Sequence, residues 1–191
     1  MSNSVARRAH HSSRVPLMAA ANATTTSAGD TDPKTLKIDK KAVRRAQNEE
    51  LLKNKNVQAF LQMTAKAEGG DYHAKFGWVR GKDAWTFSDE STHPGVGKDG
   101  HTTAAGLYQI NRACWTEHGI KSQGLVDFSP HTQDLIAVDN IRSFKMIQHI
   151  VDGEIKTPIK VLLTRKQWTS FGVHKYETLE AWYKAAGGTL K

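Results

Sequence analysis

The sequence is poor in the features that define disulfide-rich, membrane-spanning and metal-cluster proteins. It has one cysteine, Cys114, which excludes an intramolecular disulfide and a cysteine-cluster metal site. No apolar run approaches the roughly 20 residues that span a bilayer, so no stable membrane insertion is expected. The remaining composition, with 38% hydrophobic and 24% charged residues, is typical of a globular protein.

Excess charge is confined mainly to the N-terminal third. Residues 1–60 carry eleven Lys or Arg against five Asp or Glu, whereas residues 61–191 carry sixteen against fourteen. Basic charge attracts polyanions such as nucleic acid, anionic lipid and the bacterial wall. The interpretation we favour is a solvated basic tail before a nearly neutral domain. Nucleic acid is not an expected ligand of that domain, because its basic residues do not gather around its aromatic motifs.

Residues 1–39 are predicted to form a flexible, low-complexity basic tail. The stretch 19–31 consists almost entirely of Ala, Thr, Ser, Asn and Gly, which offer too little apolar surface to bury. An N-terminal export signal is the less favoured alternative. Residues 15–21 follow three arginines and precede a possible cleavage site, but this apolar segment is short and contains Pro16.

Residues 40–191 are predicted to form one α+β domain, mostly helical with a small β lobe. Residues 40–55 are charged and rich in helix formers, which is typical of a surface helix. A second helix is expected to begin with Asn54 or Asn56 as its cap and to end at Glu68, before two glycines. Its apolar positions follow a helical spacing: Val57, Phe60, Leu61 and Thr64.

The rest of the domain changes character twice. Over residues 71–105, aromatic and apolar residues alternate with Gly, Asp, Ser and Pro, which predicts short strands and turns. Ser129 followed by Pro130 is a helix-start signal, and the apolar pattern after it predicts one long helix through Ile147. A final amphipathic helix is expected over residues 176–186.

Glu68 is the first candidate catalytic residue. It lies eleven positions after Val57, about 20° away around the helix axis, and so it projects toward the apolar face. A carboxyl that is partly desolvated there has a raised pKa and can act as a general acid near neutral pH. The alternative is an exposed glutamate in a fraying last turn. The helix dipole disfavours a negative charge at that end, so stability is a poor reason for its position.

A second candidate region is the segment 104–111. Its small residues allow close backbone approach, while Tyr108 and Gln109 offer an aromatic surface and an amide. Sugar rings bind to that combination, because they present both an apolar face and hydroxyl groups. The alternative is an ordinary turn with Tyr108 and Ile110 in the core, and composition alone favours it.

Several short motifs occur in a fixed order between Val57 and Lys191. They are Phe60-Leu61, Ala67-Glu68-Gly69, Ser88-Asp89, His93-Pro94, Ala105-Gly106, Tyr108-Gln109, Asp127-Phe128-Ser129-Pro130, Gln133-Asp134, Asp152-Gly153-Glu154-Ile155, Trp168 with Ser170, and Lys184-Ala185-Ala186-Gly187-Gly188-Thr189. Together they resemble the motifs of the lambda-type endolysins, a lysozyme-like family of lytic transglycosylases that act on peptidoglycan. The resemblance covers about two-thirds of the chain.

The resemblance implies a lysozyme-like fold with a cleft between a small β lobe and a helical lobe. It makes Glu68 the catalytic acid, and it implies substrate-binding roles for five residues: Tyr108, Gln109, Asp89, Trp168 and Ser170. In such enzymes the glutamate protonates the glycosidic oxygen between N-acetylmuramic acid and N-acetylglucosamine. It then deprotonates the muramoyl 6-hydroxyl, which attacks the anomeric carbon and gives a 1,6-anhydro product, so no second carboxylate is obligatory.

A second catalytic carboxylate nevertheless has candidates in the expected β lobe, namely Asp71, Asp83, Asp89 and Glu90. The separation from Glu68 would distinguish a retaining from an inverting hydrolase. Asp89 is preferred because it matches the Ser-Asp motif of the family, with turn capping as the alternative role. Where the family has an acidic residue after an aromatic one, this chain has Val79-Arg80, so a supporting carboxylate is not expected there.

No metal or other cofactor is expected. The nine histidines lack the helical spacing of a metal-ligand motif. Cys114 has no assigned histidine partner, which favours a buried thiol over a nucleophile.

The sequence therefore predicts a monomeric enzyme whose partner is bacterial peptidoglycan. The expected site of action is the periplasm or cell wall, after synthesis in the bacterial cytoplasm and release by a holin. Hydrolysis by water, as in a muramidase, is one alternative to transfer to the 6-hydroxyl. A second alternative is a non-catalytic module that binds wall polymer or other polyanions through its basic N-terminal segment.

Overall fold

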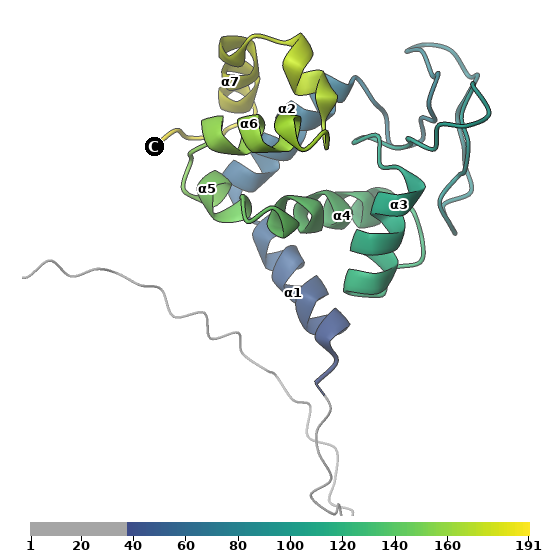
Figure 1. Ribbon diagram of the computed structural model, residues 1–191, viewed down its shortest axis with the longest axis horizontal. Coiled ribbons are helices and arrows are strands. Elements are labelled where there is room, and N and C mark those ends of the chain that lie inside the picture. The colour runs from purple at the N-terminus through teal and green to yellow at the C-terminus, as the bar shows by residue number, and fades with distance from the viewer. Residues whose placement is uncertain (1–37) are drawn as a thin grey trace, which may run out of the picture. The chain divides into compact units, whose positions relative to one another are not determined.

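The structure is a computed structural model, and it describes residues 38–191 (Figure 1). The predicted flexible tail and the alternative export signal lie outside these residues, apart from the last two positions of the tail. None of the helices in the described part is long and apolar enough to cross a membrane.

The first two helices begin and end where local sequence signals place them. Helix α1 spans Lys40–Leu52, and helix α2 spans Lys55–Glu68. The Asn54 side chain accepts hydrogen bonds from the first turn of α2, and Gly69 ends the helix in the left-handed conformation with φ 65°. All four apolar-spaced positions predicted for this helix are buried. Helix α2 therefore forms the centre of the domain, where it contacts α1, α4, α5, α7 and η2.

The predicted long helix after Ser129 is interrupted. Helix α4 spans Pro130–Ser143 and begins with the Ser129 cap as expected, but the chain then turns before α5, Ile147–Val151. Lys145 in the turn has a φ of 60°, which ends the helical hydrogen bonding. The prediction of one continuous helix through Ile147 was wrong.

The remaining helices span ten residues or fewer. They are α3 (Arg112–Cys114), the π-helix η1 (Trp115–Lys121), α6 (Lys156–Thr164), the 3-10 helix η2 (Thr169–Val173) and α7 (Tyr176–Ala185). The final helix was predicted, and α7 confirms it.

Residues 69–111 form a lobe of loops to one side of the helices, coloured blue to teal in Figure 1. Within residues 38–191 no β-strand forms, and three isolated bridges replace the predicted strands: Ala74 with Thr86, Lys75 with Ala105, and Ala105 with Ile110. Glycines interrupt the apolar alternation, so no segment stays extended long enough for a ladder. The small β lobe is thus a loop lobe, and the fold is mostly helical.

A buried polar network fastens α1 to α4. Asp139 on α4 is 2% exposed and accepts hydrogen bonds from Arg44 Nε at 2.5 Å, Asn48 Nδ2 at 3.0 Å and His118 Nδ1 at 2.9 Å. Arg142 Nη1 donates to Asn48 Oδ1 at 2.5 Å. Such fully paired polar groups fix how two helices pack, because any shift leaves a buried charge without a partner.

Candidate active site

Glu68 is the last residue of α2, and its side chain is half-buried rather than frayed into solvent. Burial raises the pKa of the Glu68 carboxyl, and a hydrogen bond that Oε1 accepts from the Ser170 hydroxyl offsets part of that rise. The carboxyl therefore holds its proton at a higher pH than an exposed glutamate does. This is the property that a general acid requires.

The segment that carries Ser170 is anchored on both sides. Trp168 is 3% exposed, and its Nε1 donates to the carbonyl oxygen of Tyr108 at 3.0 Å. The Phe171 ring packs edge-on against Phe60 of α2, with 6.1 Å between the ring centroids. These contacts hold Ser170 between α2 and the turn at Gly106–Gln109.

That turn lies directly against the end of α2. A Cβ added to Gly70 would lie 2.7 Å from the Leu107 carbonyl oxygen and 2.9 Å from that of Gly106, so only glycine fits this approach. Gln109 has a φ of 50° and is half-buried, and its Nε2 donates to the Gly106 carbonyl at 3.0 Å. Glu68 and Gln109 thus lie close in sequence to the two segments that approach each other at Gly70 and Gly106-Leu107.

Tyr108 is part of the core. Its side chain is 3% exposed, and its hydroxyl donates to Asp134 Oδ1 at 2.7 Å, as the Tyr72 hydroxyl does at 2.9 Å. Burial raises the pKa of Asp134, and the two tyrosine hydrogen bonds offset part of the rise. The Tyr108 and Trp168 rings present no face to solvent in this structure. Tyr108 therefore lies in the core together with Ile110, as the alternative interpretation of this segment expected.

Gln133 is a central residue of the site that sequence reasoning did not assign to a role. It is fully buried on α4, and its Oε1 accepts from the Leu107 backbone N–H at 2.9 Å. Its Nε2 donates to the carbonyls of Tyr72 at 3.0 Å and Phe128 at 2.9 Å. The Gln133 side chain thus connects the backbone at Tyr72, just after α2, with the backbone at Leu107 and at Phe128. The Gln133-Asp134 motif was the available sequence signal, and it gave no indication of these backbone partners.

The four alternative carboxylates all lie in the loop lobe. Asp71, Asp83 and Asp89 are exposed. Glu90 is half-buried and pairs with His73, with 2.7 Å between Oε1 and Nε2. Asp89 accepts a hydrogen bond from the Ser91 backbone N–H at 2.9 Å, which is the turn-capping role.

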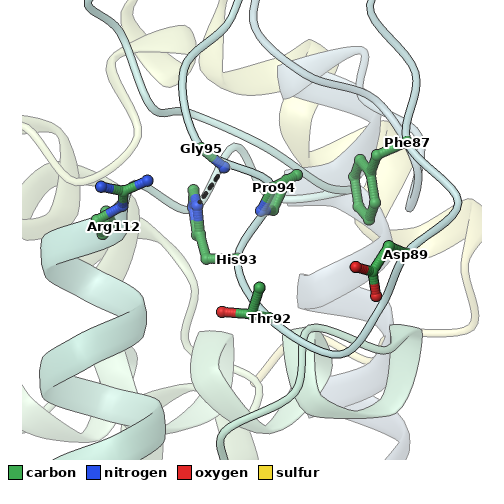
Figure 2. A pocket seen from close by; sticks show the side chains of 7 residues that line it. All are labelled: Phe87, Asp89, Thr92, His93, Pro94, Gly95 and Arg112. Carbon is green, nitrogen blue, oxygen red and sulfur yellow. Dashed lines mark hydrogen bonds between the residues drawn. The ribbon is translucent and has the colours of Figure 1, made fainter.

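Asp89 also lines an open hollow of about 300 Å³ in the loop lobe, together with Phe87, Thr92, His93, Pro94, Gly95 and Arg112 (Figure 2). A second hollow of about 370 Å³ lies behind Tyr108, where Glu49 of α1 and His131 of α4 form part of its wall. Neither hollow has Glu68 in its lining.

Other reactive side chains are inert in this arrangement. Burial raises the pKa of the Cys114 thiol to about 12, so it remains protonated and is a poor nucleophile near neutral pH. Across the described residues, no group of three or more His, Cys, Asp or Glu side chains has an arrangement that could hold a metal ion.

Comparisons with known proteins identify relatives of this chain. The family model described as Endolysin matches residues 58–190. The endolysin of Escherichia phage lambda is 32% identical over 153 residues, which cover 72% of this chain and 95% of the relative. The endolysin of Escherichia phage P2 is 31% identical over 159 residues, with 71% and 94% covered.

Solved structures give the same result. A bacteriophage lambda lysozyme complexed with a chitohexasaccharide has a TM-score of 0.61 at 31% identity, and the match covers 72% of this chain and 97% of that one. A second structure of the lysozyme from bacteriophage lambda has a TM-score of 0.59 at 29% identity, with the same coverage. The fold and these relatives therefore define a lysozyme-like enzyme that degrades peptidoglycan. The chain belongs to the endolysin family, which confirms the resemblance inferred from the motifs.

Proposed function

We propose that this chain is a lytic transglycosylase that cleaves the β-1,4 bond between N-acetylmuramic acid and N-acetylglucosamine, with Glu68 as both acid and base. The observation that carries the proposal is the half-buried Glu68 carboxyl at the end of α2, whose pKa is raised by burial. We also assign the catalytic domain to residues 40–191, with residues 1–39 as a tail.

The reaction begins with transfer of the Glu68 proton to the glycosidic oxygen, while the bond from that oxygen to the anomeric carbon of the muramoyl residue breaks. The resulting carboxylate then removes the proton from the 6-hydroxyl of the same sugar, and the freed oxygen bonds to the anomeric carbon. The products are a 1,6-anhydromuramoyl end and a free 4-hydroxyl, and Glu68 regains its proton. A single carboxyl performs both proton transfers.

Ser170 positions the catalytic group in this scheme. Its hydroxyl donates to Oε1 and leaves Oε2 for the glycosidic oxygen. Because the same hydrogen bond stabilises the ionised form, it also helps Glu68 to release its proton. Gln109 is half-buried in the turn that lies against the end of α2, and we assign to it a direct substrate contact through its amide.

The surroundings of Glu68 support transfer rather than hydrolysis through a second carboxylate. Three of the four alternative acids are exposed, and the fourth pairs with His73. Asp134 accepts hydrogen bonds from the hydroxyls of Tyr72 and Tyr108. The scheme with one carboxyl therefore needs no rearrangement of these side chains.

Mass spectrometry of the products from purified peptidoglycan tests the proposal. Wild type should release muropeptides ending in 1,6-anhydromuramic acid, and Glu68→Gln should lower their rate of formation at least about 100-fold. Glu177→Gln, at an exposed position on α7, is the matched control and should retain activity.

Three other outcomes would each overturn part of the proposal. Reducing-end muramic acid products would make water the nucleophile and the enzyme a muramidase. Full cleavage by Glu68→Gln would refute the catalytic assignment. No cleavage by wild type would favour a non-catalytic module that binds wall polymer.

The proposed setting is the bacterial periplasm or cell wall, which a monomer reaches from the cytoplasm after a holin opens the membrane. Mass spectrometry of protein recovered from the periplasm should show an uncleaved N-terminus. Light scattering of the full chain should give the mass of one 21.2 kDa chain. A trimmed N-terminus would support the export signal instead, and a mass of two chains would overturn the monomer.

A further inference from the structure

Two charges of opposite sign lie at the two ends of the hollow in the loop lobe. In Figure 2 the Asp89 carboxylate is at one end and the Arg112 side chain is at the other, with His93 and Pro94 between them. Both charged residues are exposed. The hollow, at about 300 Å³, has the size of the smallest ligand pockets and is too small for an oligosaccharide.

Neither charge is neutralised by a neighbour. Hydrogen bonds from the Ser91 side chain and backbone lower the pKa of Asp89, so this carboxyl is ionised at neutral pH. The Arg112 guanidinium lies over the backbone of Gly95, where an added Cβ would be 3.3 Å from Nη2. Across residues 38–191, neither Asp89 nor Arg112 takes part in an ion pair.

The wall between the two charges is uncharged and fixed. His93 is 5% exposed, its Nε2 donates to the Ile110 carbonyl at 3.0 Å, and its Nδ1 accepts from the Gly95 N–H at 3.1 Å. Burial lowers the pKa of His93, so the ring stays neutral. Pro94 and Phe87 add apolar surface. The hollow thus offers an anion, a cation and an apolar wall.

This hollow is tied to the turn beside Glu68. Ile110, which holds the His93 ring, exchanges two backbone hydrogen bonds with Ala105, at 2.7 and 3.1 Å, and these close the turn Gly106–Gln109. The Arg112 N–H donates to Thr103 Oγ1 at 3.1 Å. The same hydrogen bonds therefore hold both the hollow and the turn beside Glu68 in place.

We propose that the hollow binds the zwitterionic end of the diamino acid in the stem peptide of peptidoglycan, with Asp89 on its ammonium group and Arg112 on its carboxylate. The inference rests on the proposed function, because it places the glycan of the same substrate at Glu68. A neutral sugar would desolvate both charges without compensating either one. An uncrosslinked stem that ends in diaminopimelate carries both countercharges on one carbon, so the enzyme should prefer such stems.

Titration calorimetry with two peptides tests this binding without any cleavage. The first is L-Ala-γ-D-Glu-meso-diaminopimelate, and the second has lysine in place of diaminopimelate, which removes only the distal carboxylate. The full wild-type chain should bind the first about tenfold more tightly, a difference of roughly 1.4 kcal/mol. Arg112→Gln should bind both peptides equally, and Asp89→Asn should weaken both.

Exposed residues outside the hollow supply the controls. Arg165→Gln and Asp83→Asn should keep the wild-type affinities and the wild-type preference. A variant that merely misfolds would lose affinity for both peptides and would not lose selectivity alone. Equal binding of the two peptides by wild type, or an unchanged preference in Arg112→Gln, would overturn the proposal. Because the assay does not depend on cleavage, failure of the Glu68 mechanism would be seen separately.

Discussion

The hydroxyl of Ser170 donates a hydrogen bond to Oε1 of Glu68, although 102 positions separate these residues in the sequence. Glu68 ends α2, and Ser170 lies in η2, so the bond joins the central helix to the C-terminal part of the domain. It acts against burial in setting the pKa of the carboxyl. The two effects together determine at which pH the acid is protonated.

Removing this hydroxyl should move the pH dependence of cleavage. In Ser170→Ala the Glu68 carboxylate loses its donor, so the pKa of the carboxyl rises further. A general acid works in its protonated form, and the alkaline limb of kcat/KM should therefore shift to higher pH. Ser170→Thr, which keeps a hydroxyl, should restore the wild-type limb. Thr169→Ala, at an exposed neighbour, should leave it unchanged. A limb that stays in place or moves to lower pH in Ser170→Ala would contradict the assigned contact.

Neutralising the catalytic acid should stabilise the fold at neutral pH. The folded pKa of Glu68 lies above its ordinary value of 4.5, so the native state binds more protons than the unfolded state between the two values. The stability that Glu68 contributes to the wild type is therefore fully present below pH 4.5, and it is lost as the pH rises through the folded pKa. Glu68→Gln escapes that loss and should melt at a higher temperature at pH 8, by roughly 2–4 °C for each kcal/mol recovered. Calorimetry at pH 8 and pH 4 should show the gain at pH 8 alone, and an equal gain at both would refute this explanation.

The sequence predicted the helices that are defined by local signals. The Asn54 cap, the apolar spacing and the glycine at the end determine α2 within a few neighbouring residues. The break after α4 could not be predicted in this way, because Lys145 adopts a positive φ without a glycine or proline to mark it. In the loop lobe, the alternation of aromatic and polar residues predicts strands. The tertiary structure shows that the lobe forms three isolated bridges instead of strands.

The candidate site was also predictable only where a local sequence signal defines a residue. Glu68 could be found from its angular position on one helix. Ser170 emerged only from the family resemblance, because its contact with Glu68 is long-range. Gln133 was missed as a positioning residue, since its three partners are backbone atoms of Tyr72, Leu107 and Phe128 and such partners leave no mark in the sequence.

The fit of Gln133 against the turn predicts unequal effects at two glycines. Both have a positive φ, 65° at Gly69 and 74° at Gly106. Around Gly69 an added Cβ meets nothing within 4 Å, whereas at Gly106 it would lie 2.0 Å from Gln133 Oε1. Gly69→Ala should therefore cost about 1 kcal/mol of unfolding free energy, from backbone conformation alone. Gly106→Ala should cost more and should also lower kcat, because displaced Gln133 releases the Leu107 N–H. Urea unfolding and initial rates measure both effects, and equal losses at the two positions would contradict the role assigned to Gln133.

Helix α1 precedes the region that the family model matches, and Asp139 is the residue that fastens it to α4. Burial raises the pKa of Asp139, but hydrogen bonds from His118, Asn48 and Arg44 outweigh that effect and hold the pKa well below its usual range. The stabilisation is therefore present above the unfolded value of 3.8 and is lost as pH falls through the lower folded value. Asp139→Asn, which removes the negative charge that accepts hydrogen bonds from Arg44, Asn48 and His118, should lower the unfolding free energy by about 3 kcal/mol at pH 7. Urea unfolding at pH 7 and pH 3 should show a smaller difference from wild type in acid. Asp83→Asn, at an exposed position, should differ little from wild type at either pH. A difference for Asp139→Asn that is equally large at both pH values would mean that shape, and not charge, holds α1 in place.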